Sequence, residues 1–314
     1  NDGNLEAMWA RVENEGHWTG EYWTRRKDGV AYAERLSISR ITDETGDIHQ
    51  FAAVLSDVTR RKKDEEKIRY QASYDTLTGL PNRELFMDRL GQAIASTRRL
   101  HHKMGLIFID LDGFKMVNDS LGHDIGDLLL KEAAIRLERS IRDTDTVARL
   151  GGDEFTVIMP NLEDPRLIQV VAQRILDTLA DTFVLAGQEC FISGSLGITV
   201  FPDDAKTVSD LLKNADTAMY LAKEEGKANY QFYTEKLNQD VIERVNIKNG
   251  LVKALDRNEL ELYYQPKLDM TTDRVTGVEA LMRWSNDTMG PVSPARFIPI
   301  MEETGQVVEV GAWA

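Results

Sequence analysis

The sequence predicts an α/β chain of several modules, the middle one an α+β domain built on a central antiparallel sheet. Two observations lead to this prediction. From residue 74 onward, short apolar runs alternate with longer runs of helical periodicity, in the order β-α-β-β-α-β. The length of 314 residues also exceeds that of one ordinary domain. We expect the helices to cover one face of the sheet.

The first 56 residues alternate between apolar and polar side chains, as strands do. Strands are predicted at residues 18–25, 30–41 and 48–56, with turns at 27–29 and 43–47. They would form an antiparallel meander. Opposite charges at helical spacing follow over residues 60–69 and favour a solvated connecting helix. A weak heptad pattern there leaves open a parallel coiled coil with a second copy of the chain.

The middle region combines both periodicities up to residue 233. Its predicted helices span residues 84–99, 124–142, 165–182 and 208–225. Its predicted strands span residues 104–110, 145–150, 155–159 and 230–233, with a strand pair across 183–201. Only four residues separate the second and third of these strands, which predicts a hairpin. A long amphipathic helix, 238–256, then leads to a third region with strands at 260–266 and 275–282.

Composition limits the partners and the compartment. The net charge of −14 argues against nucleic acid as the main partner, because duplex binding depends on basic patches. The single cysteine, Cys190, cannot form an internal disulfide, and we interpret it as core filler. No apolar run approaches the roughly 20 residues that span a bilayer. The prediction is a cytoplasmic chain with no membrane segment, although a longer parent protein could carry an anchor upstream.

A first group of chemically active residues follows a predicted strand that ends at Asp110. A carboxylate held rigidly at a strand end suits Mg²⁺, which prefers oxygen ligands. The chain then passes through Gly113, where free backbone amides can face phosphate oxygens, and Lys115 adds positive charge. A calcium-binding EF-hand loop is the rival interpretation. That loop needs glycine at its sixth position and glutamate at its twelfth, where this sequence has Lys115 and Leu121.

A second group lies in the predicted hairpin, where Gly151 and Gly152 precede Asp153 and Glu154. Two glycines permit a tight turn with positive φ. A plain polar turn is the simpler interpretation. However, adjacent strands would bring Asp153 near Asp110, and such a carboxylate pair could hold one or two divalent ions. Two such ions can stabilise the attacking and leaving oxygens of a phosphoryl displacement.

These motifs resemble the diguanylate cyclase, or GGDEF, family from about residue 74 to residue 233. The matching stretches are residues 75–83, 110–115 with Asn118 and Asp119, 151–155, 215–216 and 219–227. The resemblance implies a palm-like domain similar to nucleotidyl cyclases. It also implies an activity, the condensation of two GTP molecules into cyclic di-GMP with release of pyrophosphate.

The resemblance carries residue roles with it. The implied catalytic residues are Asp153, Glu154 and Asp110. The implied ligands of Mg²⁺ or Mn²⁺ are Asp110, Asp153 and the carbonyl of Leu111. The implied GTP-binding residues are Phe114, Lys115, Asn118, Asp127, Lys223 and Lys227, with Asn118 and Asp127 facing guanine. Arginine is commoner at the position of Lys227, so bidentate geometry is lost there while the charge is kept.

Two further implications concern assembly and control. Each domain of this family holds one GTP, so catalysis needs a homodimer in which the two substrates meet. Arg142 and Asp145 have the Arg-x-x-Asp spacing and end shortly before Gly151. At this offset they resemble the family's product-inhibition site, which binds cyclic di-GMP. A plain cluster of charges at a helix end is the alternative.

The flanking regions resemble other modules of bacterial signalling proteins. Residues 1–59 resemble the back half of a PAS sensor domain, and residues 60–73 would be a linker helix. The cyclase domain would span residues 74–236, followed by a linker helix at 237–257. Residues 258–314 resemble the start of an EAL phosphodiesterase domain, a TIM-like barrel, and Gln265, Glu279 and Arg283 match its motif positions. A full barrel needs roughly 250 residues, so this truncated part should hydrolyse nothing.

Rival functions remain open at this point. The chain could be an active cyclase, or its GGDEF domain could bind GTP without turnover and regulate an attached phosphodiesterase. In the longer parent, the net activity could also be hydrolysis of cyclic di-GMP. The intact motif and Asp110 favour the active cyclase over the GTP-binding regulator, whereas domain order alone does not separate net synthesis from net hydrolysis.

Overall fold

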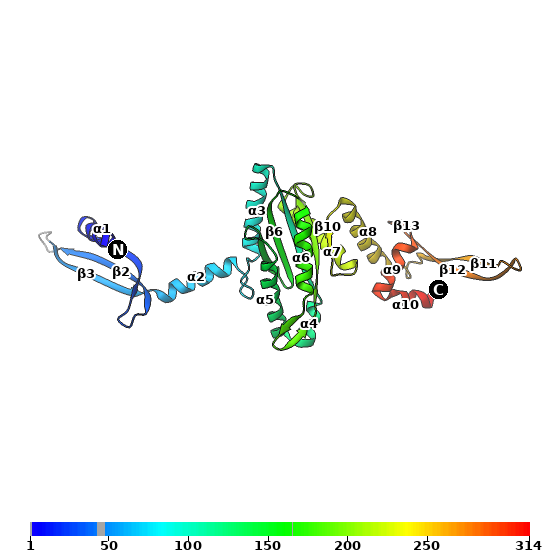
Figure 1. The fold of residues 1–314 in the computed structure, drawn as a ribbon, viewed down its shortest axis with the longest axis horizontal. Helices are drawn as coiled ribbons and strands as arrows, with labels where there is room; N and C mark the ends of the chain where they lie inside the picture. The colour runs from blue at the N-terminus through cyan, green and yellow to red at the C-terminus, as the bar shows by residue number, and fades with distance from the viewer. Residues whose placement is uncertain (1, 43–47, 165) are drawn as a thin grey trace. The chain divides into compact units, whose positions relative to one another are not determined.

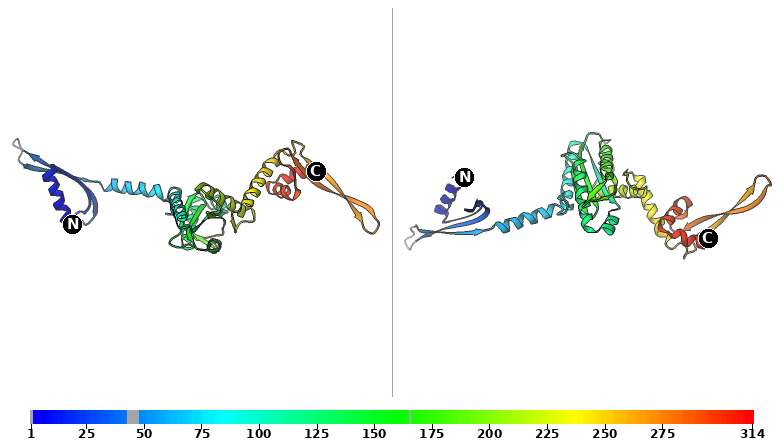
Figure 2. Two further views of the ribbon diagram at one scale, coloured as in Figure 1. Left: turned by 90° about the horizontal axis from the view of Figure 1, so that it is seen from above. Right: turned by 60° about the horizontal axis from the view of Figure 1, so that its bottom comes forward.

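The computed structural model describes residues 2–42, 48–164 and 166–314 (Figures 1 and 2). The chain divides into two compact units, residues 1–85 and 86–314. The predicted turn at 43–47 and the predicted helix start at Pro165 lie outside the described residues.

The first unit contains the predicted meander. Its elements are α1 (Asp2–Glu15), β1 (His17–Arg25), β2 (Ala31–Thr42), β3 (Ile48–Asp57) and α2 (Thr59–Ser73). The strands pair antiparallel in the order β1-β2-β3, which confirms the meander. Helix α2 buries no residue, as expected of a solvated helix. Helix α1 was not predicted; it packs Met8 and Val12 against Ile38 of β2.

The central sheet of the second unit has five strands in the order β10-β9-β4-β6-β5. Their bounds are β4 (Lys103–Asp112), β5 (Thr146–Gly151), β6 (Glu154–Leu162), β9 (Ser193–Phe201) and β10 (Tyr230–Phe232). Four of them pair antiparallel, and the edge strand β10 runs parallel to β9. The sheet is therefore mixed, with an antiparallel centre. The order of strands and helices in the α/β prediction is confirmed.

Helices cover both faces of this sheet, so the prediction of one covered face was wrong (Figure 1). Leu106 of β4 shares a core cluster with residues of α3 (Arg83–Leu100) and α7 (Val208–Glu224). Its neighbour Gly105 faces the opposite way, where an added Cβ would lie 2.2 Å from Ile168 of α6 (Arg166–Ala180). Helix α5 (His123–Arg139) packs beside α6. The sequence feature that indicated two covered faces was the unbroken apolar run of β4, which is typical of a strand buried on both faces.

Three short elements complete this domain. Helix α4 (Phe114–Leu121) occupies part of the stretch that the sequence predicted as a loop. The region 183–201 holds three strands rather than a pair, because β7 (Phe183–Leu185) and β8 (Gln188–Cys190) form a hairpin before β9. Cys190 is buried and not in a disulfide, as predicted for a core residue.

The C-terminal part of the second unit begins with α8 (Glu235–Leu251). It continues through β11 (Leu260–Asp269), β12 (Arg274–Asn286), β13 (Gly290–Val292), α9 (Pro294–Thr304) and α10 (Gln306–Trp313). The three strands pair antiparallel, and no closed barrel is formed by the residues that the structure describes. The truncated TIM-like barrel therefore stays a prediction. A small core around Trp284 and Phe297 holds the helices to the base of the sheet.

Candidate active site at the end of strand β4

Strand β4 carries Asp110 to the edge of the sheet, beside the predicted hairpin. Asp110 lies opposite Glu154 of β6 and opposite Ser195 of β9. The backbone N–H of Leu111 donates to the carbonyl oxygen of Asp153 at 3.3 Å. The structure thus places the first acid of the hairpin next to Asp110, as the sequence predicted.

The hairpin turn depends on its two glycines and on one arginine. Gly151 and Gly152 have φ angles of 152° and 53°, values that residues with a side chain rarely adopt. The guanidinium of Arg149 donates to the carbonyl oxygen of Gly152 through Nε at 3.0 Å and through a terminal nitrogen at 2.7 Å. Sequence reasoning missed this residue. Its position two residues before the glycine pair was the available signal, because a side chain there can reach back over the turn.

Charge at the site is concentrated on Asp110, which is only 8% exposed. Burial raises the pKa of its carboxyl, and the neighbouring charges of Asp153 and Asp112 raise it further. The ammonium of Lys223 lies 2.7 Å from the carboxylate and opposes this rise. Lys223 comes from α7, which packs on the face of the sheet toward which Asp110 points. The site therefore gathers acids that repel one another and a single lysine that compensates them in part.

This arrangement fits a divalent cation. Hard oxygen donors are the preferred ligands of Mg²⁺ and Mn²⁺, and two carboxylates that repel each other gain from a shared cation. No group of three His, Cys, Asp or Glu side chains with metal-site spacing occurs in the described parts of the chain. Asp110 and Asp153 are the two carboxylates predicted to hold such an ion, with the carbonyl of Leu111 as the expected third ligand.

The predicted guanine residues lie on two helices that pack together. Gly113, with φ of 83°, ends the strand loop and caps the start of α4, so Phe114 and Lys115 form the first turn of that helix. Asn118 lies against α5, because a Cβ added at Gly126 would be only 1.9 Å from its Oδ1. Asp127 follows Gly126 directly and is exposed. The fold thus places Asn118 against the residue that directly precedes Asp127 in α5.

Of the two predicted GTP-binding lysines near the end of α7, Lys223 lies in the last turn of the helix and Lys227 lies just beyond it. Lys227 is exposed and has φ of 62°, within a turn that begins at Gly226. This turn reaches back to β4, where the carboxylate of Asp112 accepts a hydrogen bond from the Ala228 backbone N–H at 3.3 Å. Asp112 was not singled out by the sequence, which offered no reason to separate its role from that of Asp110.

Arg142 and Asp145 lie at a separate place, in the turn between α5 and β5. The backbone N–H of Arg142 donates to Asp145 Oδ2 at 3.1 Å, and burial raises the pKa of the Asp145 carboxyl. In the strand register, Thr146 of β5 pairs with Ile158 of β6, and Ile158 pairs with Leu106 of β4. Leu106 is four residues from Asp110, so the turn is displaced by roughly 13 Å along the strands. A ligand at this turn would leave the Asp110 site open.

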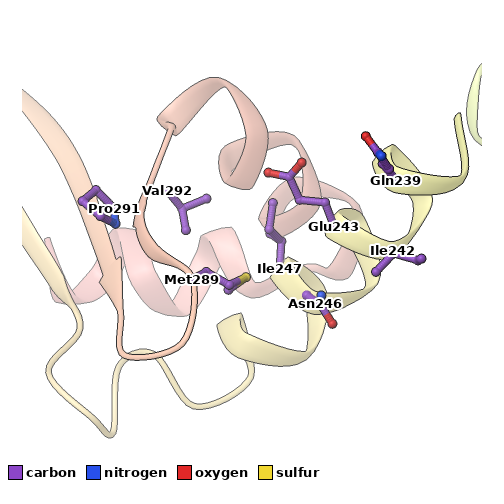
Figure 3. Close-up of a pocket in the computed structure, with 8 residues that line it drawn as sticks. All are labelled: Gln239, Ile242, Glu243, Asn246, Ile247, Met289, Pro291 and Val292. Carbon is purple, nitrogen blue, oxygen red and sulfur yellow. The ribbon is translucent and has the colours of Figure 1, made fainter. Parts of the chain in front are cut away.

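The three EAL positions lie on the β11–β12 hairpin. Gln265 and Glu279 are opposite each other in the pairing, and Lys267 lies 3.3 Å from the Glu279 carboxylate. Both Gln265 and Glu279 are exposed, whereas Arg283 is half-buried nearer the base of the hairpin. A pocket of 270 Å³ in this part of the chain is bordered by α8 and β13, with Ile247 and Val292 among its lining residues (Figure 3). It contains none of the residues predicted to bind GTP.

The described residues include no helix long and apolar enough to cross a membrane.

Comparison with known proteins identifies two protein families along the chain. Residues 72–229 match the family described as "Diguanylate cyclase, GGDEF domain", and residues 248–314 match the EAL domain family. The bifunctional diguanylate cyclase/cyclic di-GMP phosphodiesterase MucR of Pseudomonas aeruginosa is 41% identical over 242 residues, which cover 77% of this chain and 35% of MucR. The cyclic di-GMP phosphodiesterase PdeR of Escherichia coli is 36% identical over 258 residues, covering 82% of this chain and 38% of PdeR. The chain thus spans little more than a third of the length of these relatives.

Solved structures agree on the central domain. The GGDEF domain of TpbB (YfiN) from Pseudomonas aeruginosa superposes with a TM-score of 0.53 at 35% identity, covering 54% of this chain and 98% of that one. The coiled coil and GGDEF domain of DgcB from Caulobacter crescentus, solved with c-di-GMP, superposes with a TM-score of 0.51 at 26% identity, covering 56% and 93%. Neither the matched families nor these structures test the partial PAS domain, which stays a prediction. This chain therefore belongs to the GGDEF diguanylate cyclase domain family, and its GGDEF domain is followed by the start of an EAL domain.

Proposed function

We propose that this chain is an active diguanylate cyclase, which joins two GTP molecules into cyclic di-GMP and releases pyrophosphate. The observation that carries the proposal is the placement of Asp110 and Asp153 side by side at the edge of the sheet, with Lys223 as the compensating cation. The unaltered Gly-Gly-Asp-Glu-Phe run supports it.

Recognition of the base and of the phosphates would be divided between the two sides of the β4 loop. Asn118 and Asp127 together offer a donor and an acceptor, which suits the edge of guanine. The free amides after Gly113, in the first turn of α4, would face the phosphates, with charge supplied by Lys115 and Lys227. Because α4 follows β4 directly through Gly113, Lys115 and Asn118 lie within one turn of each other, while Asp127 and Lys227 would approach the same GTP from α5 and from the turn after α7.

In the reaction itself, the 3′-hydroxyl oxygen of one GTP attacks the α-phosphorus of the other, and the bond to pyrophosphate breaks. A bound Mg²⁺ or Mn²⁺ would lower the pKa of the hydroxyl and neutralise charge on the leaving group. Asp153 would accept the proton that the hydroxyl loses. Lys223 would hold Asp110 in place and limit the repulsion between the carboxylates. Each domain supplies half of this site, so two copies of the chain must meet.

The test is incubation of the full chain with GTP and Mg²⁺, with the products identified by mass. We expect cyclic di-GMP and pyrophosphate from the wild type. Asp153→Ala should reduce turnover by about 10²- to 10⁴-fold, the usual contribution of a general base. Asp177→Ala on α6 is the matched control, because Asp177 is exposed and accepts a hydrogen bond from Gln173 of the same helix. Near-normal turnover by Asp153→Ala would overturn the assignment.

A second candidate is a GTP-binding domain that regulates a phosphodiesterase. It is favoured by the EAL start and by the similarity to PdeR, whose name describes a cyclic di-GMP phosphodiesterase. The same experiment separates the two functions. GTP that binds tightly in a calorimeter but yields no cyclic di-GMP at any protein concentration would support the regulatory function instead.

A further inference from the structure

Asp112 is an acid beside the site that no role described above uses. It is the last residue of β4 and is 8% exposed. Its Oδ1 accepts from the Ser195 hydroxyl at 2.8 Å. Its Oδ2 accepts from the Ser193 hydroxyl at 2.7 Å and from the Ala228 backbone N–H at 3.3 Å. Both carboxylate oxygens are therefore occupied by donors from two different parts of the chain.

The turn that Asp112 contacts has an unfavourable backbone. Gly226, Lys227 and Ala228 follow one another with φ angles of 111°, 62° and 50°. Left-handed backbone is unfavourable for residues with a β-carbon, so two successive non-glycine residues persist there only when their surroundings hold them. One tie leads back to α7, where the Lys227 N–H donates to the Ala222 carbonyl at 3.1 Å. Asp112 ties the same turn to β4.

We propose that Asp112 is a positioning residue, which fixes the turn carrying Lys227 at a set distance from the phosphate loop that begins at Gly113. This inference rests on the proposed function, because it assigns Lys227 to the phosphates of GTP. Asp112 stands immediately before the loop and accepts a bond from the residue immediately after Lys227. Asp112 thus links directly the two backbone segments that would contact the triphosphate, in addition to the bonds that Asn229 makes to the same turn.

A metal-ligand role is the rival, since Asp112 is two residues from Asp110. The hydrogen bonds argue against it. The Asp110 carboxylate pairs with a lysine that can move aside, whereas the Asp112 carboxylate is held by two serine hydroxyls and a backbone amide that cannot leave without breaking the turn. The Ser195 hydroxyl is itself fully buried. The lone pairs of the Asp112 carboxylate are therefore used by hydrogen bonds within the protein rather than by a metal ion.

Two substitutions at this position separate the rivals. Asp112→Ala removes the hydrogen bond that Asp112 accepts from the turn and the two that it accepts from the serines. Asp112→Asn can keep all three, because its oxygen can accept from Ala228 while its amide donates to the Ser195 hydroxyl, which also accepts. A positioning role therefore predicts that asparagine rescues the function and alanine does not. A metal ligand would be lost in both variants, and each would need more Mg²⁺.

The binding measurement uses 3′-deoxy-GTP, which lacks the attacking hydroxyl and cannot react. We expect Asp112→Ala to weaken its binding by about 10- to 100-fold, the usual effect of losing a supporting contact, and Asp112→Asn to bind nearly as the wild type does. The Mg²⁺ concentration for half-maximal binding should stay unchanged. Since Asp112 acts through the turn of Lys227, Asp112→Ala should add little in a chain that already carries Lys227→Ala.

A second measurement does not depend on nucleotide. Hydrogen exchange at the Ala228 amide should accelerate in Asp112→Ala and stay slow in Asp112→Asn, without any ligand. Wild-type analogue binding by Asp112→Ala, or equal losses in both variants with a raised Mg²⁺ requirement, would overturn the inference. If the wild type binds no analogue, the proposed function fails, and the role toward phosphates fails with it. The exchange at Ala228 then still decides whether Asp112 holds the turn.

Discussion

Gly197 is the position where α7 lies closest to the sheet, and its replacement by alanine should break that packing. A Cβ there would lie 1.9 Å from the carbonyl oxygen of Ala215 and 2.2 Å from the backbone nitrogen of Met219. Both are backbone atoms of α7, so no side-chain rotation relieves the clash. To restore ordinary contact the helix must move by roughly 1.5 Å in a close-packed core. Overpacking usually costs about 1–3 kcal/mol, and a clash with helix backbone belongs at the upper end of that range.

Gly91→Ala is the matched control, because Gly91 lies within α3 with no atom within 4 Å of the added Cβ. Removing a glycine from a helix should stabilise the domain by about 0.5–1 kcal/mol. The same substitution is thus expected to act with opposite sign at the two glycines. Hydrogen exchange of peptides from β4, followed at increasing urea concentrations, measures the unfolding free energy of this domain alone within the full chain. GTP turnover should also fall in Gly197→Ala, because Lys223 is carried by the displaced helix. Equal stability of the two variants would refute the packing argument.

Three further predictions concern charge. Burial raises the pKa of the Asp110 carboxyl, so the folded chain binds that proton more tightly than the unfolded chain does. The free energy of unfolding should therefore fall as pH rises from about 4 through the raised pKa, and metal-free urea titrations of Asp110→Asn should lack that part of the fall. Arg149→Lys should slow GTP turnover without changing GTP affinity, since it loses the paired bonds to the Gly152 carbonyl that shape the hairpin; an equal loss of affinity in calorimetry would argue against this. Arg142→Ala should relieve inhibition by added cyclic di-GMP and leave the initial rate unchanged, whereas a slower initial rate would mean that the turn only supports the fold.

Elements whose sequence pattern has one interpretation were predictable. Strand β4 is apolar at almost every position and ends in an acid, and the glycine pair at 151–152 admits only a tight turn. Together they were enough to predict that Asp153 would lie near Asp110. Asp153 and Asp110 are adjacent because of the strand register: when the length of the hairpin and the end of the neighbouring strand are both known, few alternative pairings of the strands remain.

Features that depend on contacts between distant segments were not predictable. The Asp112 carboxylate is satisfied by residues about 80 and 116 positions away, so nothing local distinguishes it from Asp110. Helix α1 was missed because its few apolar side chains, such as Met8 and Val12, stabilise it only by packing against β2. In both cases tertiary contacts determine the local role, and a single sequence does not contain them in readable form.

Helix α7 joins the stability of the domain to the chemistry proposed for it. One face of the helix packs on Gly197 of the sheet, its last turn carries Lys223 to Asp110, and the turn beyond it, which contains Lys227, donates the Ala228 backbone N–H to Asp112. The acids at the end of β4 are thus held by two lysine-bearing segments that share one support. A shift of α7 would uncover the buried charge of Asp110 and displace the turn of Lys227 at the same time. Repulsion between Asp110 and Asp153 works against folding when no cation is bound, so the close packing of α7 at Gly197 is expected to contribute to holding Lys223 against these acids.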